Sequence, residues 1–288
     1  MAKLIFGCGY LGGRVARLWQ QADRVHVVTR SVARAASWRT SGWQPHVGDV
    51  VRPESLTGLP AAEAVLYAVG YDPASGVAPA DVYLRGLQHA VAALPRGVPC
   101  HFLYVSSTSV YGQQDGGWVD ESAATEPITP TGKLLVTAED WLRRQADEHL
   151  RVTILRLAGI YGPGRVPRLA AVRQGQPIAT MAEGWLNLIH VDDAARAIVA
   201  LAARSDLAGT YNVADEEPIR RRDYVELLAR LVGVPPPPLV PPDPQAVAGH
   251  DAANRRISNH RLRAALGFTF TWPSCRAALP GLVAPEGG

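Results

Sequence analysis

The sequence predicts an α/β protein in which a doubly wound parallel sheet is covered by helices. Short apolar runs rich in β-branched residues alternate with longer segments that carry apolar residues at helical spacing, through roughly the first two hundred residues. Several of these runs are apolar on both faces, as in strands buried under layers of helices. The first run leads directly into a glycine-rich turn, which is typical of folds that bind a dinucleotide.

The expected strands and helices take up most of the chain. Strands are predicted over residues 3–6, 24–30, 64–69, 101–107, 152–157 and 210–214. Helices are predicted over residues 15–22, 81–94, 133–149, 192–204, 220–233 and 259–268. The last two helices end near Gly233 and Gly267, because glycine readily adopts the left-handed conformation that closes a helix.

The composition changes after residue 214. The stretch over 234–244 is rich in proline, which lacks an amide donor and fixes φ, so neither a helix nor a central strand can form there. We interpret it as a rigid surface connector, with a polyproline recognition ligand as the alternative. The predicted division is a dinucleotide-binding Rossmann domain, residues 1–162 joined by 188–214, and a smaller C-terminal substrate lobe, residues 163–187 and 215–288.

The overall composition is that of a globular protein and excludes several other classes. The 288 residues are 47% apolar and 19% charged, with a formal net charge of +3, which does not fit a disordered chain. Basic residues are not clustered with interleaved aromatic residues, so nucleic-acid binding is not expected. No apolar run approaches the roughly 18 residues of a membrane span and no signal peptide is visible, so we expect no membrane partner and a cytoplasmic location.

Cysteine and lysine are both rare. Cys8, Cys100 and Cys275 lie far apart, without CxxC spacing or histidine clusters, so we expect neither a disulfide framework nor a metal site. The 29 basic residues are all arginines except Lys3 and Lys133. A single arginine is therefore a weak indication of an anion site, whereas Lys133 is a more specific choice of residue.

Glycines follow the first strand at the spacing GxGxxG, as Gly7, Gly9 and Gly12, with Tyr10 and Leu11 between the last two. A dinucleotide site needs glycine for a tight turn, for close approach of the backbone to a pyrophosphate, and for close packing of helix on strand. The pattern is informative here because a strand precedes it and a helix follows it. A merely structural turn is the alternative.

The end of the second strand bears on which dinucleotide binds. Sites that prefer NAD place Asp or Glu there, to bind the ribose 2′-hydroxyl. This chain has Arg30 and Ser31 instead, followed one helical turn later by Arg34. A guanidinium and a hydroxyl suit a 2′-phosphate, so the sequence favours NADP over NAD.

Two later segments complete the predicted cofactor site. Asp49, followed by Val50, is placed to accept a hydrogen bond from the adenine amine, with a simple turn aspartate as the alternative. The fourth strand leads into Ala68, Val69 and Gly70, which we also assign to the cofactor site.

Four longer segments resemble the extended short-chain dehydrogenases/reductases, the NAD(P)-dependent sugar epimerase/dehydratase family. They are FLYVSSTSVYG at 102–112, ILRLAGIYGPGR at 154–165, LNLIHVDDAARAI at 186–198 and TYNVADEEP at 210–218. These segments occur in the order found in the family and span most of the chain. The GCGYLG form of the glycine turn is similar to an atypical branch of the family, the YeeZ-like proteins.

The resemblance implies a catalytic Ser or Thr after the fifth strand, which orients the reacting oxygen of the substrate. It also implies a Tyr and a Lys four residues apart on the next helix, where the Tyr exchanges a proton and the Lys lowers the Tyr pKa. Alignment on the letters VYG puts Ser107 at the serine position. A buried serine at a strand end is the alternative for Ser107.

The helix after this strand departs from the family pattern because it contains no Tyr. Alignment on Glu139 puts Thr131 in the Tyr place and Leu135 in the Lys place. Alignment on Lys133 would put Thr129 in the Tyr place instead. The proline after Thr129 makes that residue an N-cap with proline at the first helical position, so we prefer the alignment on Glu139.

A threonine hydroxyl cannot replace the missing phenol as a general acid, because its pKa lies far above the phenol value of about 10. Three replacements remain open. Lys133 begins the helix near the cofactor and could donate or polarise, although it could also be a solvated first-turn residue. Tyr111 or Tyr161 could point into the cleft, or the substrate could carry an acidic proton of its own.

Substrate-binding residues are expected where the family covers its substrate. Arg165, after YGPG, and Arg255 with Arg256 would suit a phosphate or a carboxylate. His190, in IHVDD, could line the cleft, with a structural role as the stronger alternative. In the same motif, Asp192 is expected to cap the following helix.

These observations predict an NADP-dependent oxidoreductase or epimerase/dehydratase-like enzyme that acts on a small polar or nucleotide-sugar-like substrate. Ser107, Thr131 and Lys133 are its predicted catalytic residues. The alternative is an NAD(P)-binding sensor or scaffold without redox turnover, which the missing Tyr favours. By resemblance, a homodimer through the helices over 81–94 and 133–149 is also expected.

Overall fold

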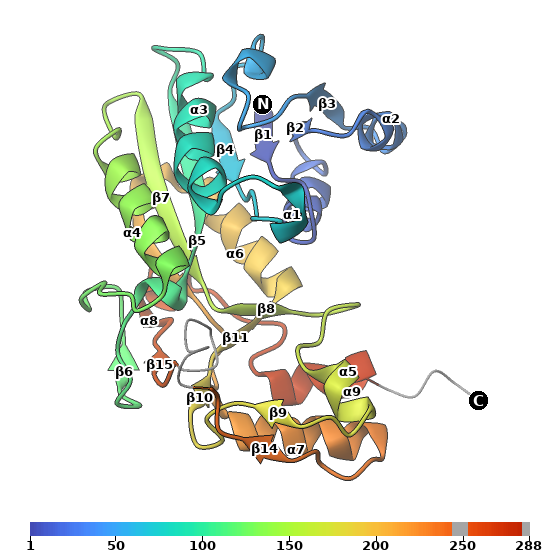
Figure 1. The fold of residues 1–288 in the computed structure, drawn as a ribbon. Helices are drawn as coiled ribbons and strands as arrows, with labels where there is room; N and C mark the ends of the chain where they lie inside the picture. The colour runs from blue at the N-terminus through green and yellow to red at the C-terminus, as the bar shows by residue number, and fades with distance from the viewer. Residues whose placement is uncertain (244–252, 284–288) are drawn as a thin grey trace. The chain divides into compact units, whose positions relative to one another are not determined.

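A computed structural model describes residues 1–243 and 253–283 of the chain (Figure 1). Its internal contacts separate two units. Unit 1 consists of Met1–Ser107, Lys133–Arg156 and Ala195–Tyr211. Unit 2 consists of Thr108–Gly132, Leu157–Ala194 and Asn212–Gly288. Four segments that the predicted division assigns to the Rossmann domain belong to unit 2 instead, namely residues 108–132, 157–162, 188–194 and 212–214.

A seven-stranded sheet forms the Rossmann fold, in the order β12-β7-β5-β4-β1-β2-β3. Its strands are β1 (Ala2–Phe6), β2 (Arg24–Thr29), β3 (Gln44–Val47), β4 (Ala64–Tyr67), β5 (Cys100–Ser107), β7 (Leu150–Leu157) and β12 (Gly209–Val213). β1 pairs in parallel with both β2 and β4, so the strand order reverses there. Ligands of doubly wound sheets bind beyond the carboxyl ends of the strands at such a point.

The burial of the central strands confirms the predicted doubly wound α/β fold. All four residues of β4 are buried, as are Leu4, Ile5 and Phe6 of β1. Strands buried on both faces need helices on both sides, and the helices that connect the strands are α1 (Gly12–Trp19), α2 (Val32–Thr40), α3 (Gly86–Ala92), α4 (Pro130–Arg143) and α6 (Val191–Ala202).

Two helical segments of unit 1 differ from the prediction. α2 has no predicted counterpart because its apolar periodicity is weak, with Ala35 as its one buried residue. The helix predicted over 81–94 is present as a continuous helix over 79–92, but its residues Asp81–Arg85 are π-helical and α3 follows them directly. The hydroxyl of the buried Tyr67 donates a hydrogen bond to the Val82 carbonyl at 2.9 Å. A side chain that engages a helix carbonyl in this way accounts for the π-helical turn.

Unit 2 has its own hydrophobic core and several two-residue or three-residue strands. Its strands are β6 (Trp118–Val119), β8 (Gly159–Tyr161), β9 (Ile178–Ala179), β10 (Trp185–Leu186), β11 (Leu188–His190), β13 (Ile219–Arg220), β14 (Leu239–Val240) and β15 (Arg256–Ile257). Its further helices are α5 (Leu169–Arg173), α7 (Arg221–Val232), α8 (His260–Leu266) and α9 (Cys275–Val283). The core includes Tyr161, Tyr224, Leu228 and Leu279, all almost fully buried.

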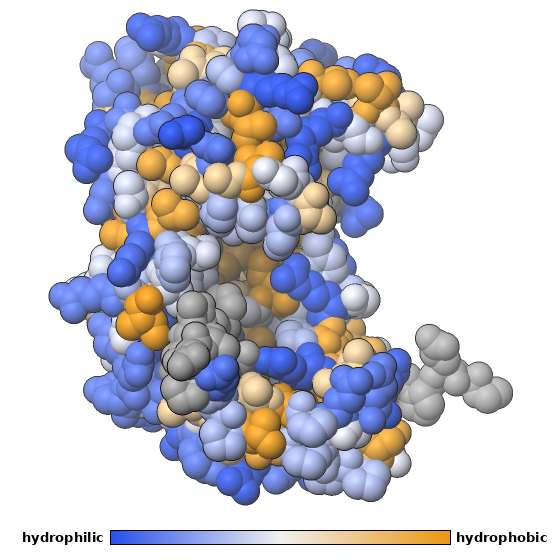
Figure 2. Space-filling view, in the orientation of Figure 1, coloured by the Kyte–Doolittle hydropathy of each residue, from blue (hydrophilic) through white to orange (hydrophobic). Residues whose placement is uncertain are grey.

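The proline-rich stretch carries β14, which pairs in parallel with β9. Pro244, the last residue of that predicted connector, lies outside the described residues. Within 1–243 and 253–283, no helix is long and apolar enough to cross a membrane. Hydrophilic residues cover most of the visible face, with apolar residues scattered among them (Figure 2).

Candidate functional site

The glycine turn after β1 is shaped by steric requirements that differ among its three glycines. Gly7 has a φ of +89°, a conformation that favours glycine. A Cβ on Gly7 would collide with the backbone of Ala68, and a Cβ on Gly12 would collide with the carbonyl oxygen of Gly7. No atom lies within 4 Å of the place where a Cβ of Gly9 would stand. The open space at Gly9 is what close approach of a phosphate to the backbone requires.

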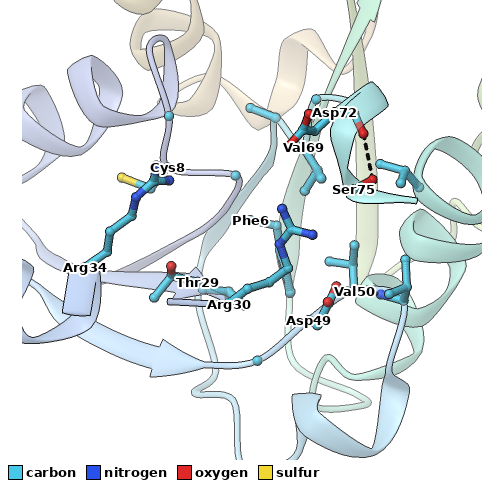
Figure 3. Close-up of a pocket in the computed structure, with 18 of the residues that line it drawn as sticks. Phe6, Cys8, Thr29, Arg30, Arg34, Asp49, Val50, Val69, Asp72 and Ser75 are labelled. Atoms are coloured by element: carbon cyan, nitrogen blue, oxygen red, sulfur yellow. Dashed lines mark hydrogen bonds between the residues drawn. The ribbon is translucent and has the colours of Figure 1, made fainter. Parts of the chain in front are cut away.

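A pocket of about 220 Å³ lies in unit 1, beyond the carboxyl ends of β1, β2 and β4 (Figure 3). Most of the predicted cofactor residues line it, namely Gly7, Gly9, Arg30, Arg34, Asp49, Val50, Ala68, Val69 and Gly70. Sequence reasoning missed several further lining residues, including Cys8, Thr29, Trp38 and Asp72. Cys8 and Thr29 could have been found because they neighbour predicted residues in the chain, whereas Trp38 and Asp72 do not.

The positive charge in this pocket comes from two arginines, and the carboxylates of Asp49 and Asp72 line the pocket as well. Arg30 follows β2 directly and Arg34 lies in the first turn of α2, and Figure 3 draws both among the residues that line the pocket. In the part of the chain that the structure describes, neither guanidinium has a hydrogen-bond or ion-pair partner. The end of β2 carries no carboxylate. Two free guanidiniums at one pocket suit a phosphate, which accepts several N–H donors.

Asp49 has the turn role that the sequence analysis left open, and it also lines the pocket. Its Oδ1 accepts a hydrogen bond from the Val51 amide at 3.1 Å. Its own amide donates to Ser55 Oγ at 2.8 Å. These bonds hold the loop after β3 in place and leave Asp49 at the pocket wall.

The other predicted cofactor residues support the turn from outside the pocket lining. Tyr10 lies under the guanidinium of Arg14, whose carbon is 4.3 Å from the ring centroid. Leu11 is buried at the start of α1, where Gly12 packs against the turn. Ser31 caps α2, because its Oγ accepts the Arg34 amide at 3.2 Å.

The first turn of α4 carries two of the predicted catalytic residues. The predicted N-cap is confirmed, since Thr129 Oγ1 accepts the Gly132 amide at 3.0 Å. Thr131 and Lys133 are exposed in this turn, and Leu135 is buried. No tyrosine occurs anywhere in α4. Ser107, the third candidate, ends β5 and is half-buried.

Sequence reasoning missed a buried polar network around Glu139. Glu139 Oε1 accepts from Ser106 Oγ at 2.7 Å and from Arg156 Nε at 3.1 Å. Its Oε2 accepts from Arg156 Nη2 at 2.7 Å and from Arg143 Nη2 at 2.8 Å. The carboxylate therefore ties α4 to β5 and β7. The sequence did contain one indication of this network. Arg156 stands in an otherwise apolar strand, and a buried arginine needs a charged partner.

The three predicted substrate-binding residues lie in unit 2 in different settings. Arg165 is exposed, in a turn closed by hydrogen bonds between its backbone and that of Gly162. Arg255 is 6% exposed, and its Nη2 donates to the Thr108 carbonyl at 2.8 Å. Burial, together with nearby Arg221, lowers the pKa of Arg255 to about 10.

His190 is buried among aromatic side chains, which fits the structural role expected as its stronger alternative. Its ring is 2% exposed and lies 5.3 Å from the ring of Tyr161 and 5.3 Å from that of Trp272, measured between centroids. Its Nδ1 accepts the Asp192 amide at 3.3 Å. A ring buried in this way packs the core of unit 2 and does not line an open surface.

The cysteines and the possible metal ligands form no cluster among the residues described. Cys8, Cys100 and Cys275 are all free thiols. Burial raises the pKa of the Cys8 thiol to about 12, so it stays protonated at neutral pH although it lines the pocket. Across 1–243 and 253–283, no group of three or more His, Cys, Asp or Glu residues could hold a metal ion.

Comparison with known proteins identifies similar sequences over most of the chain. Residues 4–214 match the model of the NAD dependent epimerase/dehydratase family. Protein YeeZ of Escherichia coli is 32% identical over 223 residues, which are 76% of this chain and 75% of YeeZ. The 3-diazoavenalumate denitrifying reductase of a Streptomyces species is 31% identical over 202 residues, which are 66% of this chain and 61% of that enzyme.

Solved structures of similar proteins cover almost the whole chain. The structure of a putative NAD-dependent epimerase/dehydratase from Methylobacillus flagellatus is 32% identical, with a TM-score of 0.74, and the match covers 98% of this chain and 97% of that one. MoeE5 in complex with UDP-glucose and NAD shares the fold at 21% identity, with a TM-score of 0.79 and coverage of 98% and 97%.

Proposed function

Because the chain belongs to the NAD dependent epimerase/dehydratase family, we propose that it is an NADP-dependent oxidoreductase or epimerase/dehydratase-like enzyme. Its proposed substrate is a small polar or nucleotide-sugar-like molecule. MoeE5, which shares the fold, has a solved structure in complex with UDP-glucose and NAD. When bound, a nicotinamide cofactor supplies or accepts a hydride, and the protein's share is to bind and orient it.

The pair of unpartnered guanidiniums at the pocket carries the choice of NADP. Arg30 and Arg34 line the same pocket as Gly9, whose backbone has open space in front of it. A 2′-phosphate would accept hydrogen bonds from both guanidiniums, whereas NAD would leave both of them without a partner. A carboxylate at the end of β2, which would select the 2′-hydroxyl of NAD, is absent.

Binding of NADPH and of NADH tests this proposal directly. Charge-assisted hydrogen bonds contribute about 1.5–3 kcal/mol each, so Arg30→Gln should weaken NADPH binding by roughly 10- to 100-fold and leave NADH binding nearly unchanged. Arg39→Gln is the matched control, because Arg39 is exposed on the same helix α2 and does not line the pocket. Equal or tighter binding of NADH by the wild-type protein would refute the role given to Arg30.

The proposed catalytic roles rest on residue chemistry and on the place of each residue in the fold. Ser107 ends β5, and its hydroxyl is proposed to orient the reacting oxygen. The same task is proposed for Thr131 and Lys133, both exposed in the first turn of α4. Each would be tested by its alanine variant, with kcat as the readout and NADPH affinity as the check that the cofactor still binds.

One observation favours the alternative function, an NAD(P)-binding sensor or scaffold. α4 contains no tyrosine, so the phenol that the resemblance leads us to expect there is missing. A panel of carbonyl compounds and nucleotide sugars separates the two functions when NADPH consumption is followed. Tight NADPH binding without turnover of any compound would support the sensor and count against the enzyme.

Two further expectations stay predictions. A homodimer would form through the helices predicted over 81–94 and 133–149, and sedimentation of the purified protein would show its mass. The cytoplasmic location rests on the sequence alone.

A further inference from the structure

Two histidines lie side by side at one edge of the seven-stranded sheet. His26 lies in β2, and His46 lies in β3, the last strand in the sheet order. Nδ1 of His26 is 3.0 Å from Nε2 of His46, and the two ring centroids are 5.3 Å apart. Both residues are half-buried. No local spacing in the sequence indicates this pair, because its members stand 20 positions apart in the chain.

The strand pairing fixes where both rings stand. In the parallel pair of β2 and β3, His26 is the partner of Gln44 and Val28 is the partner of His46. His46 is therefore two residues beyond the partner of His26 and projects from the same face of the sheet. The two valines that flank His26 are 2% and 0% exposed, so β2 is anchored in the core. The two rings are thus pre-organised next to each other by the pairing of their strands.

The distance between the two ring nitrogens suits a transition-metal ion. An imidazole nitrogen binds such an ion at about 2.0–2.1 Å. Two ligands at right angles around one ion are then about 2.8–3.0 Å apart, whereas two ligands in a tetrahedron are about 3.3–3.4 Å apart. The observed 3.0 Å matches the right-angle arrangement, which Cu(II) and Ni(II) adopt with nitrogen ligands. The pair therefore fits these ions better than it fits Zn(II), which is mostly tetrahedral.

The protonation state of the pair also suits metal binding, since a histidine binds a metal only in its neutral form. Burial lowers the pKa of His26, and its neighbours His46 and Arg24 lower it further. Burial lowers the pKa of His46 as well. Because the usual histidine pKa is about 6.5, both rings are neutral at pH 7. Arg24 is exposed, so water and salt screen its repulsion of a bound cation.

We propose that His26 and His46 form a binding site for one divalent transition-metal ion, with Cu(II) and Ni(II) preferred and water completing the coordination. Without the ion, one ring carries its proton between the two nitrogens. With the ion, that ring carries its proton on its outer nitrogen instead, and two nitrogen–metal bonds replace two bonds from the ion to water. Each ring turns about its side-chain bonds so that both lone pairs face the ion. This site goes beyond the proposed function and does not depend on it.

A bound ion would cross-link two strands that lead into the pocket of unit 1. Arg30 follows β2 directly, and Asp49 lies two residues beyond the end of β3 at Val47. A ligand that binds the folded chain and not the unfolded chain stabilises the folded state by mass action. We therefore expect NiCl2 to raise the melting temperature of the wild-type protein and to leave that of a protein without the pair unchanged.

Calorimetric titration of the untagged full chain with NiCl2 tests the proposal. We expect one Ni(II) per chain. His26→Gln and His46→Gln should each weaken binding about tenfold or more, because loss of a group that only supports a metal ligand already costs about 10- to 100-fold. The double variant should lose little more than either single variant, since one imidazole alone cannot chelate the ion. Nitrogen coupling in the electron paramagnetic resonance spectrum of the Cu(II) protein should be present in the wild type and lost in the double variant.

Two controls make the test specific. His149→Gln should bind Ni(II) as the wild type does, because His149 is an exposed histidine of unit 1 outside the pair. MgCl2 should not bind at the site, since Mg(II) prefers oxygen ligands. Absence of Ni(II) binding, equal Ni(II) affinities of the His26→Gln and His149→Gln proteins, or equal binding of Ni(II) and Mg(II) would each overturn the proposal. Circular dichroism checks the fold of each variant, and if one single variant does not fold, the other decides.

These titrations use no cofactor, so they are independent of the proposed function. Failure of NADPH to bind the wild type would refute the proposed function and leave the metal titrations valid. Normal NADPH binding without Ni(II) binding would refute the metal site alone.

Discussion

The attachment of α4 to strands β5 and β7 can be tested by substitution of Glu139, whose carboxylate is buried. Its side chain is 1% exposed and accepts hydrogen bonds from Ser106, Arg156 and Arg143. Glu139→Gln keeps the size of the side chain but removes the charge and turns one acceptor oxygen into an N–H donor. That donor would face guanidinium donors, so hydrogen bonds would be lost and not rearranged.

The expected loss follows from the burial of the partner. The side chain of Arg156 is 3% exposed, so its charge cannot be solvated once the carboxylate has gone. Removal of one partner of a buried ion pair costs about 3–5 kcal/mol. Proteins of this kind are stable by about 5–15 kcal/mol in total, so Glu139→Gln should lose a large fraction of the free energy of unfolding.

Urea unfolding followed by circular dichroism measures this loss. Asp140→Asn is the matched control, because Asp140 is the next residue of α4, pairs with the same Arg143 at 2.7 Å, and is 52% exposed. An exposed pair of this kind contributes about 0–1 kcal/mol. A Glu139→Leu/Arg156→Leu double variant should be more stable than Glu139→Gln, since it buries no unpaired charge. Equal unfolding free energies for Glu139→Gln and Asp140→Asn would refute the reasoning.

Two further predictions concern the glycine turn and a buried histidine. Gly12→Ala should lower both stability and NADPH affinity, because its Cβ collides with the Gly7 carbonyl, whereas Gly9→Ala should spare stability and weaken only NADPH binding; equal melting losses would contradict this. His101 is 3% exposed and its Nε2 lies 2.8 Å from Thr153 Oγ1. Burial lowers the pKa of His101, so the unfolded chain binds its proton more readily, and the stability it contributes is present above about pH 6.5 and lost as the pH falls below that value. Unfolding free energies of the wild type should therefore fall more steeply from neutral to acid pH than those of His101→Gln, and parallel curves would exclude His101 as the source.

Features that depend on neighbours in the chain were predictable from the residues. The spacing of Gly7, Gly9 and Gly12 predicted the turn after β1, and the proline after Thr129 predicted the N-cap of α4. α2 was not predictable in this way, because its apolar spacing is too weak to indicate a buried face. The π-helical turn before α3 depends on a hydrogen bond to Val82 from Tyr67, fifteen residues away in the chain, which no local pattern indicates.

The candidate site residues also divide into those whose position could be predicted from the sequence and those whose position could not. Arg30, Arg34 and Asp49 come from separate segments, and their convergence on one pocket follows from the parallel order of β1, β2 and β3. Parallel strands present their carboxyl ends at one edge of the sheet, so a correct fold class was sufficient to bring these residues together. His190 stands in a family-like motif too, yet its ring is buried between two aromatic rings of unit 2.

The amino-acid sequence alone was sufficient for the fold class, the family and the glycine turn, because hydrophobic periodicity and turn chemistry are local properties of the chain. Pairing of buried polar groups was settled only by the tertiary structure. Ser106, Glu139 and Arg156 meet across 33 and 17 positions of the chain. The energy of such contacts depends on burial and on distances between side chains, and both exist only once the strands have paired.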